Sequence, residues 1–156
     1  MSDLCTQRLL RERKELASNP LGFSATPIKN TNGALDLSVW EASIPGRVGV
    51  HLVVMSRPHW RESISKFHSC LMNFTLLVHL NVYKLRLLGY FKPPIFHPNV
   101  YPNGTVCLKL LNDTWNPTFT ILSILKEIQR MLTDPNINSP ANKIASQNFQ
   151  LDDISF

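Results

Sequence analysis

The sequence predicts a single α+β domain, and three observations lead to that class. An amphipathic helical pattern opens the chain at residues 3–17, strand patterns follow at 22–28, 34–43 and 84–88, and a strong helical pattern covers 120–132. Strands grouped between helices favour an α+β architecture over alternating βαβ units. A chain of 156 residues is about one domain long and can bury a real core.

Composition narrows the classes of partner. Apolar residues make up 44% of the chain and charged residues 17%, as in ordinary soluble globular proteins. The formal charge of +5 without a long Lys/Arg run favours an acidic protein surface over nucleic acid. The apolar stretch 71–88 is interrupted by polar and charged residues and lacks the ~18–20 clean apolar residues of a membrane span, so we interpret it as strand material. We therefore expect no nucleic-acid or membrane partner, and a reducing intracellular compartment in the absence of a signal peptide.

The first helix carries both an apolar and a basic face. Cys5, Leu9 and Leu16 fall on one side, and opposite charges at Arg8 and Glu12 are spaced for an i,i+4 pair. Four cations are expected on the exposed side: Arg8, Arg11, Arg13 and Lys14. Either this is a solvated helix face or it is a docking surface for an acidic partner. Asn19-Pro20 ends the helix.

A hairpin is predicted next. KNTNG at 29–33, with Asn32-Gly33 at its tip, is a turn signal between strand patterns at 22–28 and 34–43. Leu35, Leu37 and Val39 alternate as in a half-buried strand, and Trp40 is interpreted as a core residue.

Residues 47–82 are the least typical part of the chain. His59, His68 and Cys70 have the side chains of zinc ligands, but their spacing matches no common site and a fourth ligand is not evident. We therefore expect no bound metal. The stretch 84–88 alternates and predicts a strand.

The clearest helix covers residues 120–132. Its apolar positions recur at helical spacing, at Ile121, Ile124, Leu125, Ile128, Met131 and Leu132. Asp134-Pro135 closes it. Ser139-Pro140 then predicts an N-cap and first position of a short helix that ends near Gln147.

The chemistry is expected in the stretch 96–108, FHPNVYPNGTVCL. Its prolines and the Pro102-Asn103-Gly104 turn exclude a plain helix or strand, so it predicts a shaped loop that presents the thiol of Cys107. A lone cysteine is usually a small buried hydrophobe. Here Cys107 supplies a nucleophile, Asn99 a neutral amide for a developing oxyanion, and Tyr101 an aromatic wall.

This stretch resembles the active-site segment of ubiquitin-like-protein conjugating enzymes, whose His-Pro-Asn motif precedes a thioester-forming cysteine. Within the family it is most similar to SUMO-conjugating enzymes, in YPNGTVCL and in the upstream wording QRLLRERK, NPLGFSATPIKNTNG and LDLSVWEASIPG. WNPTFTILSILKEIQRMLTDPNINSPAN is similar to conjugating enzymes generally. The resemblance covers about residues 3–46 and 83–148. It implies one ubiquitin-conjugating-enzyme-like domain over 1–156, with an N-terminal helix, an antiparallel β-meander and C-terminal helices.

The resemblance also implies an activity. The enzyme would accept a SUMO-like modifier as a thioester on Cys107 from a heterodimeric activating enzyme and pass it to lysines of protein substrates, assisted by SUMO ligases. No cofactor would be bound, because the activating enzyme uses the ATP of the pathway. The implied location is nucleus and cytoplasm.

Site roles carry over by position. Asn99 would support the loop and stabilise the oxyanion, His97 and Pro98 would hold the loop, and Tyr101 would contact the lysine stem. Ser139 falls where many members place an aspartate, and serine cannot be a carboxylate base. Thr105 and Ala141 would lie near the substrate. The cations Arg8, Arg11, Arg13 and Lys14 would face the modifier and the activating enzyme.

The chain departs from the family pattern in three places. Residues 47–82 form an atypical insert, from an imperfectly translated gene or from natural divergence. The third strand is expected to be missing or shortened, and so is the last helix. The interval from Cys107 to Trp115 is typical of ubiquitin enzymes, whereas the N-terminal wording favours SUMO. The alternatives are therefore a ubiquitin-conjugating enzyme or a catalytically impaired scaffold of the same fold. A cysteine hydrolase with His97 as base lacks an orienting acid.

Overall fold

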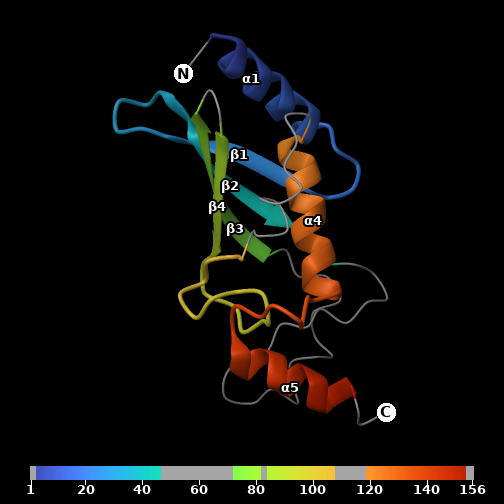
Figure 1. The fold of residues 1–156 in the computed structure, drawn as a ribbon. Coiled ribbons are helices and arrows are strands. Elements are labelled where there is room, and N and C mark those ends of the chain that lie inside the picture. Colours follow the sequence, from blue (N-terminus) through green and yellow to red (C-terminus); the bar gives the residue numbers. More distant parts are fainter. Residues whose placement is uncertain (1–2, 47–71, 82–83, 108–118, 154–156) are drawn as a thin grey trace.

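A computed structural model describes residues 3–46, 72–81, 84–107 and 119–153 of the chain (Figure 1). Its elements are α1 (Asp3–Ala17), β1 (Ser24–Lys29), β2 (Leu35–Ile44), β3 (Met72–Asn81), β4 (Lys84–Phe91), α4 (Ile121–Thr133) and α5 (Lys143–Asp153). The strands form one antiparallel sheet in the order β1-β2-β3-β4. The predicted α+β class is confirmed. None of the described helices has the length and apolar character needed to cross a membrane.

The third strand that we expect to be missing or shortened would follow the 84–88 strand, and this expectation stays a prediction. The structure has a further strand before that point: β3 pairs with β2 on one side and with β4 on the other, for example Leu77 with Val39 and with Leu88. It comes from the part of the chain predicted to be an atypical insert. Residues 47–71 lie outside the described residues, α5 is the last element described, and the expectation of a missing final helix stays a prediction.

The β1–β2 hairpin forms where it was predicted, with a change of phase inside β2. Gly33 takes a positive φ of 81° at the turn. The register then jumps, so that Pro27 pairs with Trp40 but Ile28 pairs with Asp36. Beyond the jump Trp40 is fully buried, and its indole Nε1 donates to the Leu37 carbonyl at 2.8 Å. Trp40 is thus the core residue predicted. Of the three residues predicted to alternate into the core, Leu35, Leu37 and Val39, only Leu37 is buried.

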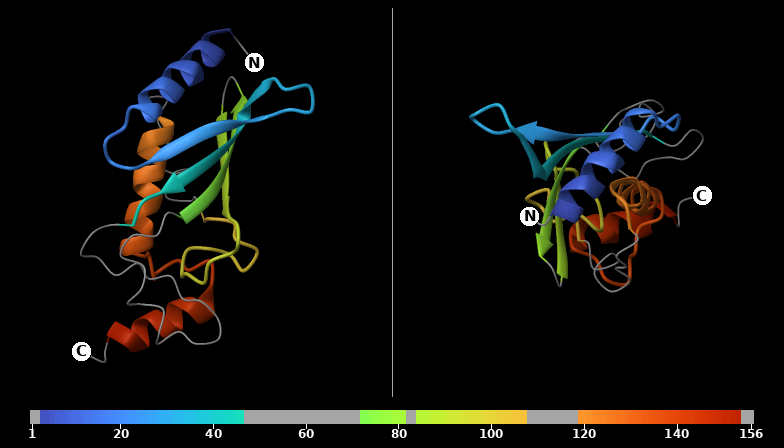
Figure 2. Two further views of the ribbon diagram at one scale, coloured as in Figure 1. Left: turned by 180° about the vertical axis from the view of Figure 1, so that it is seen from behind. Right: turned by 90° about the horizontal axis from the view of Figure 1, so that it is seen from above.

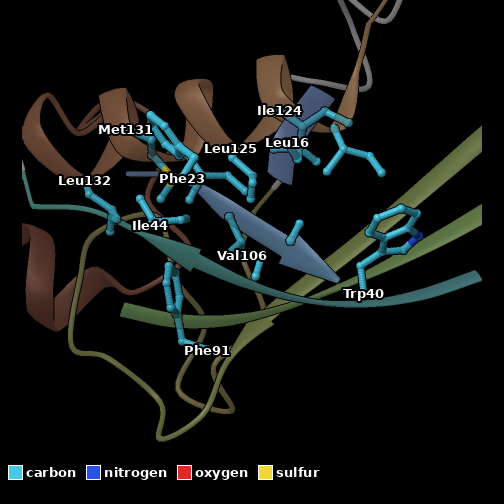
Figure 3. Close-up of a cluster of buried hydrophobic side chains, with 14 of the residues drawn as sticks. Leu16, Phe23, Trp40, Ile44, Phe91, Val106, Ile124, Leu125, Met131 and Leu132 are labelled. Carbon is cyan, nitrogen blue, oxygen red and sulfur yellow. The ribbon is translucent and has the colours of Figure 1, made fainter. Parts of the chain in front are cut away.

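The core lies between α4 and one face of the sheet (Figure 2). α4 begins with a capping box, in which the Thr120 hydroxyl accepts from the Ser123 amide and the Ser123 hydroxyl accepts from the Thr120 amide. All the predicted apolar positions are buried: Ile121, Ile124, Leu125, Ile128, Met131 and Leu132. Figure 3 shows side chains of this helix pointing toward Phe23, Ile44 and Val106. The predicted helix is therefore confirmed with its buried face.

A buried carboxylate ties α1 to the start of α4. Glu12 is 5% exposed; one oxygen accepts from Arg8 Nε at 2.8 Å and the other from the Ile121 amide at 2.8 Å. Arg8 also donates to the Phe119 carbonyl. The predicted Arg8–Glu12 pair is confirmed, but Arg8 is committed to this contact and is not a freely exposed cation of the basic face. Arg11, Arg13 and Lys14 are exposed.

The helix predicted at Ser139-Pro140 starts later. The amides of Ala141 and Asn142 both donate to the Pro98 carbonyl, at 2.8 and 3.0 Å. Because these amides are bound to the loop, the helix starts after them. Asn142 then accepts from the Ala145 amide through Oδ1, which is the hydrogen bond of an N-cap. α5 accordingly begins at Lys143 and ends at Asp153, beyond the predicted end at Gln147.

Candidate active site

The stretch with the predicted chemistry forms a short hairpin after β4. The Cys107 amide donates to the Asn99 carbonyl at 2.9 Å, and the Tyr101 amide donates to the Thr105 carbonyl at 2.8 Å. Val100 pairs with Val106 between these contacts. Side chains alternate across an extended hairpin. Val100 and Val106 are buried in the core, so the side chains on the other face are Asn99, Tyr101, Thr105 and Cys107. The pattern brings together four of the predicted site residues.

The hairpin turn depends on a glycine. Gly104 has a φ of +90°, and its carbonyl accepts from the Phe91 amide at 3.0 Å. A Cβ at this position would lie 2.5 Å from the Phe91 carbonyl oxygen. The Val106 amide donates to the Gly89 carbonyl, which fixes the returning strand to β4 as well. The turn therefore holds Cys107 at a defined distance from the sheet.

We expect Gly104→Ala to lower the free energy of unfolding by about 2–4 kcal/mol, because it adds a backbone clash to a left-handed φ. Gly33→Ala is the matched control: its φ is +81°, but nothing lies within 4 Å of the added carbon. That variant should lose only about 1–2 kcal/mol. Urea unfolding curves of both variants test the difference, and equal losses would show that the contact with Phe91 has no energetic effect.

Asn99 joins the hairpin to the segment after α4. Asn99 is 3% exposed. Its Nδ2 donates to the Asn136 carbonyl and its Oδ1 accepts from the Asn136 amide, both at 2.8 Å. This two-way contact orients the carboxamide. An amide nitrogen carries two hydrogens, so one remains for a further acceptor. The side chain can thus brace the site and still donate a hydrogen bond.

His97 and Pro98 have contacts that support the predicted structural roles. His97 is fully buried, and its Nδ1 accepts from the Asn99 amide at 3.1 Å. Its Nε2 is buried and has no hydrogen-bond partner among the described residues. Burial lowers the pKa of His97 to about 4, against a smaller opposite effect of the Met131 backbone. The imidazole is therefore neutral, and the Pro98 carbonyl holds residues 141 and 142.

The lowered pKa of His97 predicts that the folded protein becomes less stable in acid. The folded His97 has a pKa of about 4 and the unfolded one about 6.5, so the unfolded state binds more protons between these values. Stability is fully present above pH 6.5 and falls as the pH drops to about 4, by about 3 kcal/mol.

The measurement is the free energy of unfolding across this range for the wild type and for His97→Gln. We expect the difference between the two to shrink as the solution becomes acidic, because only the wild type carries the titrating imidazole. A difference that is independent of pH would contradict a buried neutral histidine.

Tyr101 lies beside the candidate nucleophile. Cys107 is partly exposed and Tyr101 is 42% exposed, so a reactant can reach both. The charge of a Cys107 thiolate raises the pKa of Tyr101, and a side-chain hydrogen bond between the two adds to the effect. The phenol therefore keeps its proton when the thiolate is present.

The other predicted residues divide into two groups. Ala141 is half-buried and bonded to Pro98 through its amide, while Ser139 is exposed on the same segment. The cations Arg11, Arg13 and Lys14 belong to α1, at the opposite end of the molecule from the 92–107 stretch and α5 (Figure 1). A surface on α1 is thus separate from the thiol site.

Sequence reasoning missed Asn136 and Asn142. Both act through contacts with the 97–99 tripeptide, 37 residues away in the case of Asn136, and these contacts cannot be predicted from the residues next to them in the sequence. Among the residues that the structure describes, no group of three His, Cys, Asp or Glu side chains is placed to hold a metal. His59, His68 and Cys70 lie outside the described residues.

Comparison with known proteins finds similarity to one family model and to curated relatives. A family model described as ubiquitin-conjugating enzyme matches residues 89–156, a range that includes the hairpin, α4 and α5. The chain is 39% identical over 150 residues to "SUMO-conjugating enzyme UBC9" of Caenorhabditis elegans, covering 94% of this chain and 81% of that protein. It is 37% identical over 147 residues to "Sumo-conjugating enzyme ubc9" of Dictyostelium discoideum, covering 92% and 83%.

Proposed function

The chain belongs to the ubiquitin-conjugating enzyme family, and we infer that it is a SUMO-conjugating enzyme, a transferase of that pathway. The observation that carries this inference is similarity to two SUMO-conjugating enzymes over more than nine tenths of the chain. It includes the N-terminal half that the general family model does not match. This favours SUMO over ubiquitin, although the interval from Cys107 to Trp115 resembles that of ubiquitin enzymes.

Cys107 is the proposed acceptor of the modifier. Its thiolate attacks the activated carboxyl carbon at the modifier's C-terminal glycine, a C–S bond forms, and the thiolate of the activating enzyme leaves. This exchange needs a reachable sulfur, and partial exposure on a rigid hairpin supplies it. A heterodimeric activating enzyme would provide the charged modifier and use the ATP, so no cofactor needs to bind this chain.

Transfer to lysine follows from the same geometry. A thioester is already activated, so positioning and an oxyanion donor matter more than a strong base. The second Nδ2 hydrogen of Asn99 is the proposed donor to the oxyanion. The lysine amine, with a pKa of ~10.4 in water, must lose its proton before it attacks. Ser139 cannot take it as a carboxylate would, and water or buffer is the proposed acceptor.

Docking is proposed at α1. Arg11, Arg13 and Lys14 are exposed there and offer positive charge to an acidic partner, either the modifier or the activating enzyme. The Arg8 side chain is 36% exposed and paired with Glu12, so it offers less free charge to this surface than the other three cations. SUMO ligases and lysine-bearing proteins complete the proposed partners, with nucleus and cytoplasm as the proposed location and no nucleic-acid or membrane partner expected.

A charging assay tests the function. The protein is mixed with activating enzyme, ATP and either SUMO or ubiquitin, each with its own activating enzyme, and run on a gel without reductant. We expect an adduct with SUMO that reductant removes, and none with ubiquitin. An adduct with ubiquitin alone would make the chain a ubiquitin-conjugating enzyme, and no adduct with either would make it a non-catalytic scaffold.

A further inference from the structure

We propose that Asn136 is a positioning residue for lysine transfer, because its side chain holds the backbone that orients the Asn99 carboxamide. The inference rests on the proposed function, since the orientation of Asn99 matters for transfer only if a thioester forms on Cys107. It goes beyond the contact of the Asn136 backbone with Asn99 and gives the Asn136 side chain a task of its own.

The backbone of Asn136 contacts Asn99 through both of its polar groups. The Asn136 amide donates to Asn99 Oδ1, and the Asn136 carbonyl accepts from Asn99 Nδ2, both at 2.8 Å. Two residues exchange a pair of bonds in this way in an antiparallel ladder, where the N–H and C=O of an extended residue point to the same side. Here the carboxamide of Asn99 takes the place of the partner strand. Its orientation therefore depends on an extended backbone at residue 136.

The side chain of Asn136 favours that backbone. Its Oδ1 accepts from the Asn138 amide at 3.0 Å, two residues further along the chain. An asparagine that accepts from the amide two residues on forms a local turn, and at helix N-caps a residue with this bond has an extended backbone. Loss of the bond should let residue 136 adopt other conformations, in which its amide and carbonyl no longer both face Asn99.

The effect of the side chain should stay local, because the segment is held at both ends by other contacts. Pro135 is buried, and its ring fixes the backbone φ just before Asn136. On the other side, the amides of Ala141 and Asn142 donate to the Pro98 carbonyl. These contacts do not involve the Asn136 side chain. A change at Asn136 is therefore expected to turn the carboxamide of Asn99 without detaching the segment from the hairpin.

Asn136→Ala removes the acceptor, whereas Asn136→Ser keeps an acceptor oxygen and adds no charge. Purified SUMO thioesters of the wild type and both variants are discharged with free lysine in single-turnover reactions. We expect Asn136→Ala to slow discharge about tenfold, the factor that one neutral hydrogen bond typically contributes. Asn136→Ser should stay within about threefold of the wild type, because serine forms the same turn more weakly. Charging of Cys107 should be unchanged in both.

Asn19→Ala is the matched control. Asn19 Oδ1 accepts from the Leu21 amide at 2.8 Å, so it forms a turn of the same kind, but it follows α1. Both asparagines are partly buried. We expect Asn19→Ala to discharge at the wild-type rate, because its turn does not contact Asn99.

A double-mutant cycle tests whether Asn136 acts through Asn99. In the Asn99→Ala background there is no carboxamide left to orient, so adding Asn136→Ala should change the discharge rate by less than about twofold. A further tenfold loss in that background would overturn the proposal, because it would place the effect of Asn136 outside Asn99. Equal slowing of charging and discharge by Asn136→Ala alone would also overturn it and assign the residue to the fold.

Hydrogen exchange of the residue 136 amide tests the same contact without any modifier. After correction for the intrinsic rate of each side chain, exchange should be about tenfold faster in Asn136→Ala than in the wild type, and close to the wild type in Asn136→Ser. Equal protection in all three proteins would show that the side chain does not hold the backbone. Failure of the wild type to form any thioester would instead overturn the proposed function, and the role in transfer with it.

Discussion

Cys107→Ala is expected to abolish SUMO transfer to lysine and leave the fold unchanged. The sulfur is the only proposed attachment point for the modifier, so its removal eliminates the covalent intermediate rather than slowing a step. The backbone contact of residue 107 with Asn99 remains available, and the side chain is only partly buried. We expect the midpoint of thermal unfolding to stay close to that of the wild type.

Cys5→Ala is the matched control. Cys5 is also a free, partly buried cysteine, but it belongs to α1. The two variants are compared by conjugation of SUMO to a protein substrate in multiple-turnover reactions. Full activity of Cys5→Ala beside no activity of Cys107→Ala is the expected result. Conjugation by folded Cys107→Ala above the level without enzyme would place the chemistry elsewhere.

Asn99→Ala is expected to slow lysine transfer about a hundredfold while charging of Cys107 survives. Removal of one oxyanion donor typically has an effect of this size, and the donor is needed when the amine attacks a loaded thioester. The change also leaves the amide and carbonyl of Asn136 without their partners, which should lower the free energy of unfolding by about 1–3 kcal/mol.

Asn103→Ala separates the two effects of Asn99→Ala. Asn103 lies in the same hairpin and accepts through Oδ1 from the Thr105 amide at 3.0 Å, but it is exposed at the turn. We expect it to change transfer less than threefold, as for a surface substitution away from the reacting groups. Single-turnover charging and discharge are measured for both variants. Equal loss of the two steps in Asn99→Ala would assign the residue to the fold alone.

The parts of the fold that could be predicted are those whose causes are local. α4 has its cap, its apolar period and its stop within one stretch of sequence, and all were visible. The stretch 71–88 could be interpreted as strand material, but its division into β3 and β4, which pair with each other, is not visible in its apolar pattern. The change in which residues of β2 are buried, just before Trp40, depends on a shift in the pairing of β1 with β2. The sequence pattern of one strand alone cannot reveal such a shift.

The site divides in the same way. Hairpin spacing brings Asn99, Tyr101 and Cys107 to one face, and that spacing is in the sequence. The start of α5 depends on Pro98, and the orientation of Asn99 depends on the backbone of Asn136. Arg8 was expected in solvent. It donates to the Phe119 carbonyl, which is too far away in the sequence for a local pattern to reveal the contact. Long-range polar contacts are therefore what the sequence left undetermined.

The most direct test of the thioester is the intact mass of the enzyme after incubation with activating enzyme, ATP and SUMO. The wild type should gain the mass of one modifier less one water, and dithiothreitol should remove it. Cys107→Ser should gain the same mass as an oxygen ester that dithiothreitol leaves in place. A wild-type adduct that resists dithiothreitol, or the same labile adduct on Cys107→Ser, would contradict attachment to the Cys107 sulfur.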